Sequence, residues 1–183
     1  MKHILMAVSG PAGVGKGTIV KTIIARRDDV VESVSCTTRP PREGEIDGKH
    51  YFFLTKEEFL RRIEEKDFLE YDEHFGNYYG TPRSFVEKTL ETKSIILEID
   101  VVGALNVKKE FPELVLVMIA PPSIEELKRR LEGRGSENEE SLKIRLARLE
   151  YELAQKDKYD YYIVNDDLET AIAEVEKIID GVK

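Results

Sequence analysis

The sequence GPAGVGKGT at residues 10–18 follows the apolar run ILMAV at residues 4–8, and this stretch decides the fold. An apolar run that turns through glycines into a helical pattern is typical of a phosphate-binding loop between a buried strand and a helix. Glycine allows backbone conformations that aim successive N–H groups at one point, and Lys16 adds a positive charge. The N-terminus of the helix expected over 18–27 adds its dipole. We therefore predict that this loop binds phosphates.

The residues expected to surround the phosphates are Gly10, Pro11, Ala12, Gly13, Val14, Gly15, Lys16, Gly17 and Thr18. The pattern G-x-x-x-x-G-K-[ST] is only partly met, because Gly17 follows the lysine and Thr18 comes one position late. This leaves open whether the Thr18 hydroxyl contacts Mg²⁺ directly or through water. A glycine-rich turn without a ligand is the alternative, but the strand, glycines, lysine and helix all occur in the required order.

The composition is that of a folded α/β domain. Of 183 residues, 41% are hydrophobic and 35% are charged, which suffices for one well-packed domain with an insertion. No apolar stretch approaches the roughly 20 residues that span a bilayer, and the first residues do not resemble a signal peptide. The net charge of −8 argues against general nucleic-acid binding. We therefore expect neither a membrane nor a nucleic-acid partner.

Cysteine and histidine usage bears on location and on metals. Cys36 is the single cysteine, so no internal disulfide can form, which fits a cytoplasmic protein. His3, His50 and His74 are scattered, which argues against a dedicated transition-metal site. Arginines nevertheless cluster at positions 39 and 42 and again between 129 and 148. Local basic clusters on an acidic protein suit a small polyanion.

Apolar runs alternate with amphipathic helical patterns along the chain. The strand-like runs cover residues 4–8, 30–34, 94–99, 114–119 and 161–164, and the helical patterns cover 18–27, 101–110, 124–131, 139–156 and 168–180. Near-continuous apolar runs are typical of parallel strands buried on both faces. The alternation predicts an α/β fold, a doubly wound parallel sheet with right-handed crossovers.

Residues 35–93 break this alternation. They hold a loop rich in Pro, Arg and Gly, a short aromatic strand at 51–53, a helix that Thr55 and Glu58 open with a capping box, and a tyrosine-rich stretch. We expect a small α+β insertion with short antiparallel strands. A glycine-flanked loop at 133–136, after the helix that Ser123 and Glu126 cap, is typical of a mobile lid. The single domain, 1–183, then divides into a core (1–34, 94–122 and 147–183), an insertion (35–93) and a lid (123–146).

A phosphate loop occurs in GTPases, ATPases and kinases alike. Asp100 and Gly103 match the D-x-x-G motif of GTPases, but the chain has no Asn-Lys pair for the N-K-x-D motif that reads guanine in GTPases. Several segments instead closely resemble the guanylate kinase family: SVSCTTRPPR (33–42), GEIDGKHYFF (44–53), FLEY (68–71), GNYYGT (76–81), LEID (97–100), RRLEGRG (129–135) and IVNDD (163–167). The match extends from residue 10 to 167. Gly17, Ala12 and Val102 depart from common family residues, and none of these changes removes a charge or glycine that the chemistry needs.

The resemblance implies that ATP phosphorylates GMP, and also dGMP, in the presence of Mg²⁺. It assigns substrate contacts to Ser35, Arg39, Arg42, Tyr51, Glu70, Tyr79, Gly80, Thr81, Glu98 and Asp100. The carboxylate of Glu70 would accept hydrogen bonds from both donors on the guanine edge, whereas adenine offers only a lone pair there. Such sites reject analogues by up to ~10⁴-fold. Planar guanidinium groups at Arg39 and Arg42 suit phosphate oxygens.

The same resemblance assigns the transfer step. Lys16 would hold the outer phosphates of ATP, and Arg134 and Arg145 would join Arg39 as catalytic residues. Arg130 and Asn165 would contact ATP, and the insertion and lid would close over both substrates to exclude water. Arg129 and Arg148 have an alternative role as helix-surface ion pairs.

Two other functions stay open at this point. A binding module of this family would typically have a degraded phosphate loop, whereas Lys16 and the glycines are intact here. A kinase for another monophosphate would keep the loop but would be expected to lose Glu70, Ser35 and the paired arginines. The oligomeric state is not determined by the sequence.

Overall fold

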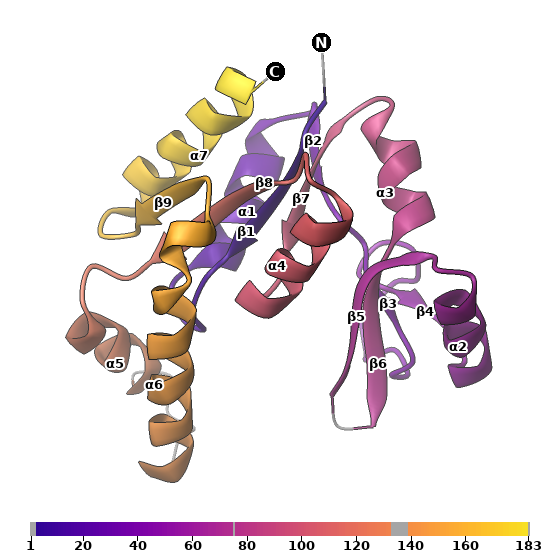
Figure 1. Ribbon diagram of the computed structural model, residues 1–183, viewed down its shortest axis with the longest axis horizontal. Helices are drawn as coiled ribbons and strands as arrows, with labels where there is room; N and C mark the ends of the chain where they lie inside the picture. The colour runs from indigo at the N-terminus through magenta and orange to yellow at the C-terminus, as the bar shows by residue number, and fades with distance from the viewer. Residues whose placement is uncertain (1–2, 75, 133–138, 183) are drawn as a thin grey trace.

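Five parallel strands form the main sheet of the computed structural model, which describes residues 3–74, 76–132 and 139–182 (Figure 1). In spatial order they are β2 (Val30–Glu32), β7 (Ser94–Glu98), β1 (Leu5–Ser9), β8 (Val115–Ala120) and β9 (Tyr161–Val164). Every pairing between neighbours is parallel. These strands are the five apolar runs of the sequence, within two residues at each end, so the predicted parallel sheet is confirmed.

Helices cover both faces of this sheet, and β1 shows why. Met6 and Val8 pack in one cluster with residues of α1 and α7, while Leu5 and Ala7 pack in another with residues of α4. Alternate side chains of a strand point to opposite faces, so a strand apolar throughout is buried twice. Figure 1 shows α4 in front of the sheet and α1 behind it. The covering helices are α1 (Lys16–Arg26), α4 (Val101–Glu110) and α7 (Leu168–Val182). Helices α5 (Ile124–Glu132) and α6 (Glu139–Ala154) pack against each other in a separate apolar cluster, and the short 3₁₀ helix η1 (Lys156–Lys158) follows them.

A second, four-stranded sheet lies apart from the first, beside α2 (Lys56–Glu64) at the lower right of Figure 1. Its strands, in spatial order, are β4 (Phe52–Phe53), β3 (Cys36–Thr37), β6 (Asn77–Pro82) and β5 (Phe68–His74). The prediction that its strands are antiparallel is wrong for one pair, because β3 and β4 run parallel. Residues 38–51 connect them, and a connection this long allows the crossover that a parallel pair needs.

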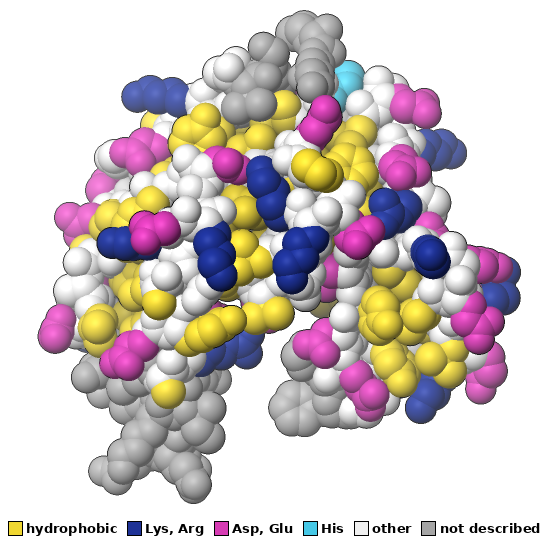
Figure 2. Space-filling view, viewed as in Figure 1, with side chains coloured by type: hydrophobic (Ala, Val, Ile, Leu, Met, Phe, Trp, Pro, Cys, Tyr) yellow, Lys and Arg dark blue, Asp and Glu magenta, His cyan; other side chains and the backbone are white. Residues whose placement is uncertain are grey.

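Helix α3 (Arg83–Leu90) joins the two sheets and was not anticipated from the sequence. Its Val86 is fully buried in the same cluster as Leu5 and Ala7 of the main sheet. Leu69 of β5 packs there too, so the small sheet is anchored to the core through β5 and α3. A notch separates the two parts in the space-filling view (Figure 2).

Local signals set the helix ends as expected. The Thr55 hydroxyl accepts a hydrogen bond of 3.1 Å from the Glu58 backbone N–H, and Ser123 accepts one of 3.0 Å from Glu126. Both N-cap contacts were predicted from the sequence. Within the described residues, none of the helices is long and apolar enough to cross a membrane.

Candidate active site

The loop between β1 and α1 has the backbone that its glycines predict. Gly10, Gly13 and Gly15 take φ values of 141°, 83° and 98°, in the region that side-chain-bearing residues avoid. A Cβ atom at Gly10 would overlap the carbonyl oxygen of Ile119 in β8. The loop therefore packs against the neighbouring strand as closely as a backbone can, and only glycine permits this approach.

Lys16 is the first residue of α1 and its ammonium group lies over the loop. It donates hydrogen bonds of 2.6 Å to the carbonyl of Gly10 and 2.9 Å to that of Pro11. Burial lowers the pKa of Lys16, and the carboxylates of Glu98 and Glu152 act in the opposite direction. A cavity of about 310 Å³, the loop cavity, lies beside this group; its lining residues are Gly13, Gly15, Lys16, Gly17, Thr18, Lys21 and Glu98.

Asn165 holds the loop through a hydrogen bond to its backbone. This residue follows β9 and is 6% exposed, and its side-chain amide donates a hydrogen bond of 2.8 Å to the carbonyl of Val14. Its amide nitrogen also lies 2.6 Å from where a Cβ atom on Gly15 would stand. Asn165, assigned to ATP by resemblance, thus contacts the loop backbone itself.

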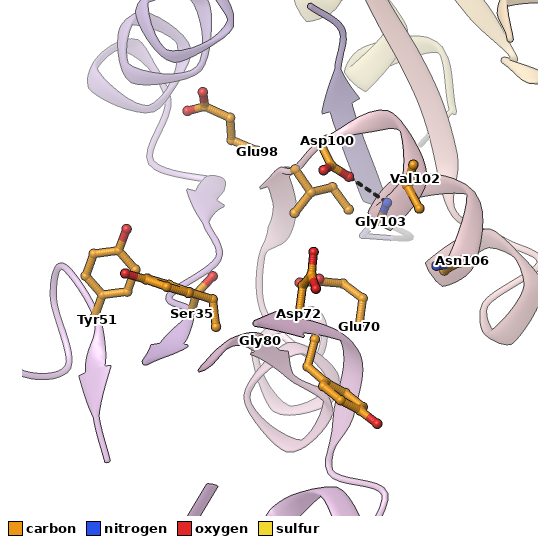
Figure 3. A pocket seen from close by; sticks show the side chains of 13 residues that line it. Ser35, Tyr51, Glu70, Asp72, Gly80, Glu98, Asp100, Val102, Gly103 and Asn106 are labelled. Carbon is orange, nitrogen blue, oxygen red and sulfur yellow. Dashed lines mark hydrogen bonds between the residues drawn. The ribbon is translucent and has the colours of Figure 1, made fainter. Parts of the chain in front are cut away.

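A larger cavity, of about 380 Å³, lies between the two sheets (Figure 3). Ser35 and Tyr51 line one side, and Val102 and Asn106 of α4 line the other. Glu98 lines both this large cavity and the loop cavity, so the two adjoin. Its side chain turns away from Glu70 and Asp100 in Figure 3.

Glu70, on β5, lines the large cavity, and a neighbouring side chain on β6 fixes its carboxylate. The hydroxyl of the fully buried Thr81 donates a hydrogen bond of 2.7 Å to its carboxylate. Burial raises the pKa of Glu70, the Thr81 hydrogen bond opposes that shift, and the negative charge of Asp100 adds to it. Gly80 is needed beside it, because a Cβ there would lie 2.9–3.0 Å from atoms of Phe68, Glu70 and Tyr71.

Asp100 caps helix α4 and connects to α6. One carboxylate oxygen accepts a hydrogen bond of 2.7 Å from the Gly103 N–H, the dashed line in Figure 3. The other accepts one of 2.8 Å from the guanidinium of Arg148, which also donates at 2.9 Å to Glu152. Sequence reasoning did not find Glu152, a carboxylate buried in α6. Arg148 makes the ion pairs that were one of its two expected roles, and Arg129 pairs with Glu126 at 2.9 Å.

Arg39 and Arg42 share one acidic partner, Glu45. The guanidinium of Arg39 donates two hydrogen bonds to the Glu45 carboxylate, at 2.8 and 3.0 Å, and the Arg42 backbone N–H donates a third at 2.7 Å. Arg39 also lies 5.6 Å from the ring centre of Tyr51. Glu45 holds the pKa of Arg39 above its ordinary value, with a smaller contribution from Tyr79. An acid three residues after Arg42 was a signal of this pair that sequence reasoning did not use.

The side chains of three arginines assigned to catalysis or to ATP binding lie outside the described part of the structure. Arg134 lies outside the described residues. The backbones of Arg130 and Arg145 belong to α5 and α6, but their side chains lie outside the description. In the described part of the chain, no cluster of three or more His, Cys, Asp or Glu residues is arranged to hold a metal ion.

Known proteins resemble this chain over nearly its full length. A family model described as Guanylate kinase matches residues 2–182. A guanylate kinase of Clostridium perfringens (strain SM101 / Type A) is 53% identical over 179 residues, which cover 97% of this chain and 83% of that protein. A guanylate kinase of Thermotoga maritima is 48% identical over 180 residues, covering 98% and 87%.

Solved structures agree with these matches. A crystal structure of guanylate kinase from Anaplasma phagocytophilum has a TM-score of 0.73 and 33% identity, and the match covers 98% of this chain and 85% of that one. A shikimate kinase from Bacteroides thetaiotaomicron has a TM-score of 0.55 and 16% identity, covering 97% of this chain and 98% of that one. This second likeness concerns the fold alone.

Proposed function

The chain belongs to the guanylate kinase family and transfers a phosphoryl group from ATP to GMP, and from this premise we propose how its residues divide the reaction. The observation that carries the proposal is the adjacency of two cavities, one on the phosphate loop and one around Glu70, with Glu98 lining both. ATP binds at the loop cavity and GMP binds in the large cavity. The γ-phosphoryl group then crosses the boundary between them.

Guanine recognition rests on Glu70. Its carboxylate accepts hydrogen bonds from N1–H and the exocyclic amine of guanine, while the Thr81 hydroxyl fixes its orientation from behind. Ser35 donates to O6, and Asp100 adds an acceptor from α4. Adenine would leave the half-buried carboxylate facing a lone pair, which explains selection for guanine. All of these contacts are to the base and none is to the ribose, so we propose that dGMP is also a substrate.

The GMP phosphate binds at Arg39, Arg42, Tyr51 and Tyr79. In the structure, the Glu45 carboxylate accepts two hydrogen bonds from the Arg39 guanidinium. A phosphate would accept hydrogen bonds from the same planar group. Arg39 remains oriented by Glu45 until GMP arrives, and this reduces the ordering that binding requires. An ammonium at either position would lack the paired geometry.

The transfer step needs positioning and charge stabilisation. An oxygen of the GMP phosphate attacks the γ-phosphorus of ATP; the bond from that phosphorus to the β–γ bridging oxygen breaks, and ADP leaves with the electron pair. The attacking oxygen is already anionic, so no strong base is required. Lys16 moves from the loop carbonyls to the outer phosphates, and Arg134 and Arg145, with Arg130, neutralise the transferring group.

Magnesium fits the donors at the loop cavity. The Thr18 hydroxyl and the Glu98 carboxylate both line it. Mg²⁺ prefers oxygen ligands and keeps several waters while it binds nucleotide phosphates. The Thr18 hydroxyl and the Glu98 carboxylate would therefore hold the ion, either directly or through water. When bound, the ion would supply positive charge that offsets the negative charge of the ATP phosphates.

We further propose the division into a core (1–34, 94–122 and 147–183), an insertion for GMP (35–93) and a lid (123–146) that closes over both nucleotides. Closure excludes water, which would otherwise accept the phosphoryl group. A free, buried Cys36 suits the cytoplasm, where thiols stay reduced. Small-angle scattering that finds equal compactness with and without both nucleotides would contradict closure.

An acceptor panel tests the proposed recognition. ADP release is measured with Mg-ATP and with GMP, dGMP, AMP, CMP or UMP in turn. Turnover confined to GMP and dGMP supports the assignment of the large cavity to guanine. Turnover led by AMP would contradict it, and no turnover with any acceptor would contradict catalysis by the intact loop.

A further inference from the structure

Arg148 joins two carboxylates that belong to different elements of the fold. One nitrogen of its guanidinium lies 2.8 Å from Asp100, which lines the large cavity at the start of α4, and another lies 2.9 Å from Glu152 on its own helix, α6. Residues 100 and 148 are 48 positions apart in the chain. Helix α6 begins inside the segment proposed as the lid (123–146), but Arg148 lies in its second half, within the proposed core, so this guanidinium connects that part of α6 to the wall of the large cavity.

Exposure separates the Arg148–Glu152 pair from an ordinary surface ion pair. The Glu152 side chain is 6% exposed, while those of Asp100 and Arg148 are 39% and 56% exposed. A pair of fully exposed charges would stabilise little. A buried carboxylate, however, requires its cation, because loss of the partner leaves a charge without compensation. Glu152 therefore holds the Arg148 guanidinium in place through Nε, and a second nitrogen, Nη2, is directed at Asp100.

The two contacts on Asp100 restrain its carboxylate group. The Gly103 N–H binds one oxygen and Arg148 binds the other, so rotation of the carboxylate would break a charge-assisted hydrogen bond. Each oxygen keeps a further lone pair, which leaves an acceptor for a ligand in the large cavity. The orientation of that acceptor is set jointly by α4 and α6.

We propose that Arg148 is a positioning residue for GMP binding: it orients Asp100 for the guanine edge and ties helix α6 to the GMP cavity. The inference rests on the proposed contact between Asp100 and guanine. It differs from a structural role of Arg148 in one measurable respect: Arg148 acts on GMP only through Asp100.

The test is a double-mutant cycle on GMP affinity. Calorimetry measures the GMP Kd of the wild-type chain, R148M, D100N and the R148M/D100N double variant, each checked by its melting curve. We expect R148M to weaken GMP binding about tenfold, the effect of one lost hydrogen bond to a charged group. D100N should weaken it similarly, and adding R148M to D100N should change little more. The KM for GMP should rise more than kcat falls.

Two further variants keep the test decisive. R129M removes an arginine that pairs with Glu126 on α5 and is 79% exposed, and it should bind GMP as the wild type does. If R148M fails to fold because Glu152 is left unpaired, R148M/E152Q removes the buried charge together with its cation and is measured in its place. R148K should restore part of the affinity.

The outcomes separate the inference from the proposed function. GMP binding by R148M within twofold of the wild type, or fully additive losses in the double variant, would overturn the inference while D100N still shows that Asp100 binds GMP. Unchanged affinity in D100N would overturn the assignment of Asp100 to guanine and, with it, the role of Arg148. Neither result would affect the acceptor selectivity measured in the nucleotide panel.

Discussion

The side-chain amide of Asn165 donates a hydrogen bond of 2.8 Å to the carbonyl oxygen of Val14, linking two residues 151 positions apart. Val14 belongs to the phosphate loop and Asn165 follows the last strand of the sheet. A phosphate loop directs its N–H groups toward the phosphates, so its carbonyl groups must be held pointing away from them. This contact supplies such a restraint, and it is buried.

Asn165→Ala should therefore impair ATP binding more than GMP binding. The Val14 carbonyl would lose its partner in a buried place, which costs about 1–3 kcal/mol of stability. The loop would also become less ordered, so we expect the KM for ATP to rise about tenfold and that for GMP to change less than threefold. Steady-state kinetics and a melting curve check this, with the exposed neighbour Asp166→Asn as control. Equal rises in both KM values would contradict the restraint.

Gly10→Ala should prevent the loop from packing on β8. The new Cβ would overlap the backbone carbonyl of Ile119, which cannot rotate away as a side chain could. Together with the φ value of 141°, this should lower the free energy of unfolding by about 3 kcal/mol or more. Urea unfolding measures it. Gly44→Ala is the matched control, since its φ is also positive but a Cβ there meets nothing within 4 Å; it should cost about 1 kcal/mol. Equal losses in both variants would refute the steric argument.

Glu45→Gln should weaken GMP binding. The neutral amide can accept only one of the two hydrogen bonds from the Arg39 guanidinium, so this side chain loses its fixed orientation before the phosphate arrives. We expect the KM for GMP to rise about tenfold, with kcat changed less. The neighbouring exposed Glu43→Gln carries the same charge change and serves as control. A lower KM in Glu45→Gln would mean instead that Glu45 competes with the substrate phosphate.

Glu70→Gln should relax selection for guanine. Glutamine keeps one acceptor but turns a donor toward one of the two guanine donors, so kcat/KM for GMP should fall about 10²-fold. The ratio of GMP to AMP turnover should fall with it. Glu73→Gln, on the same strand and exposed, controls for the loss of charge. Selectivity that survives in Glu70→Gln would remove Glu70 from the guanine contact.

The same variant should be more stable than the wild type at neutral pH. Burial raises the pKa of Glu70 in the folded protein, so its stabilising contribution is fully present below the ordinary carboxyl pKa of about 4.5 and is lost as pH rises through the raised value. At pH 7 the ionised group therefore costs stability that glutamine does not. Melting temperatures of Glu70→Gln and wild type should differ at pH 7 and converge as pH falls toward 4.5. A constant difference across this range would exclude Glu70 as its source.

Much of the fold could be predicted because its signals are local. The glycines of the loop, the apolar runs and the N-cap residues Thr55 and Ser123 each act within a few neighbouring positions, and the structure has them as expected. Helix α3 was missed because its start at Pro82 carries no side-chain cap. The parallel pairing of β3 with β4 was missed because it depends on the path of the intervening loop.

By itself, the sequence determined that the chain has a phosphate loop on a doubly wound sheet, and its motifs indicated a guanylate kinase, since these patterns depend on residue type and spacing. Only the tertiary structure decided that Glu98 lines two cavities, that Glu45 holds Arg39, and that Arg148 links α6 to Asp100. Glu98 and Arg148 depend on which strand and helix ends are neighbours, and Glu45 depends on how its loop folds back. Spacing along the chain does not carry that information; the registers of the sheets and the packing of the helices do.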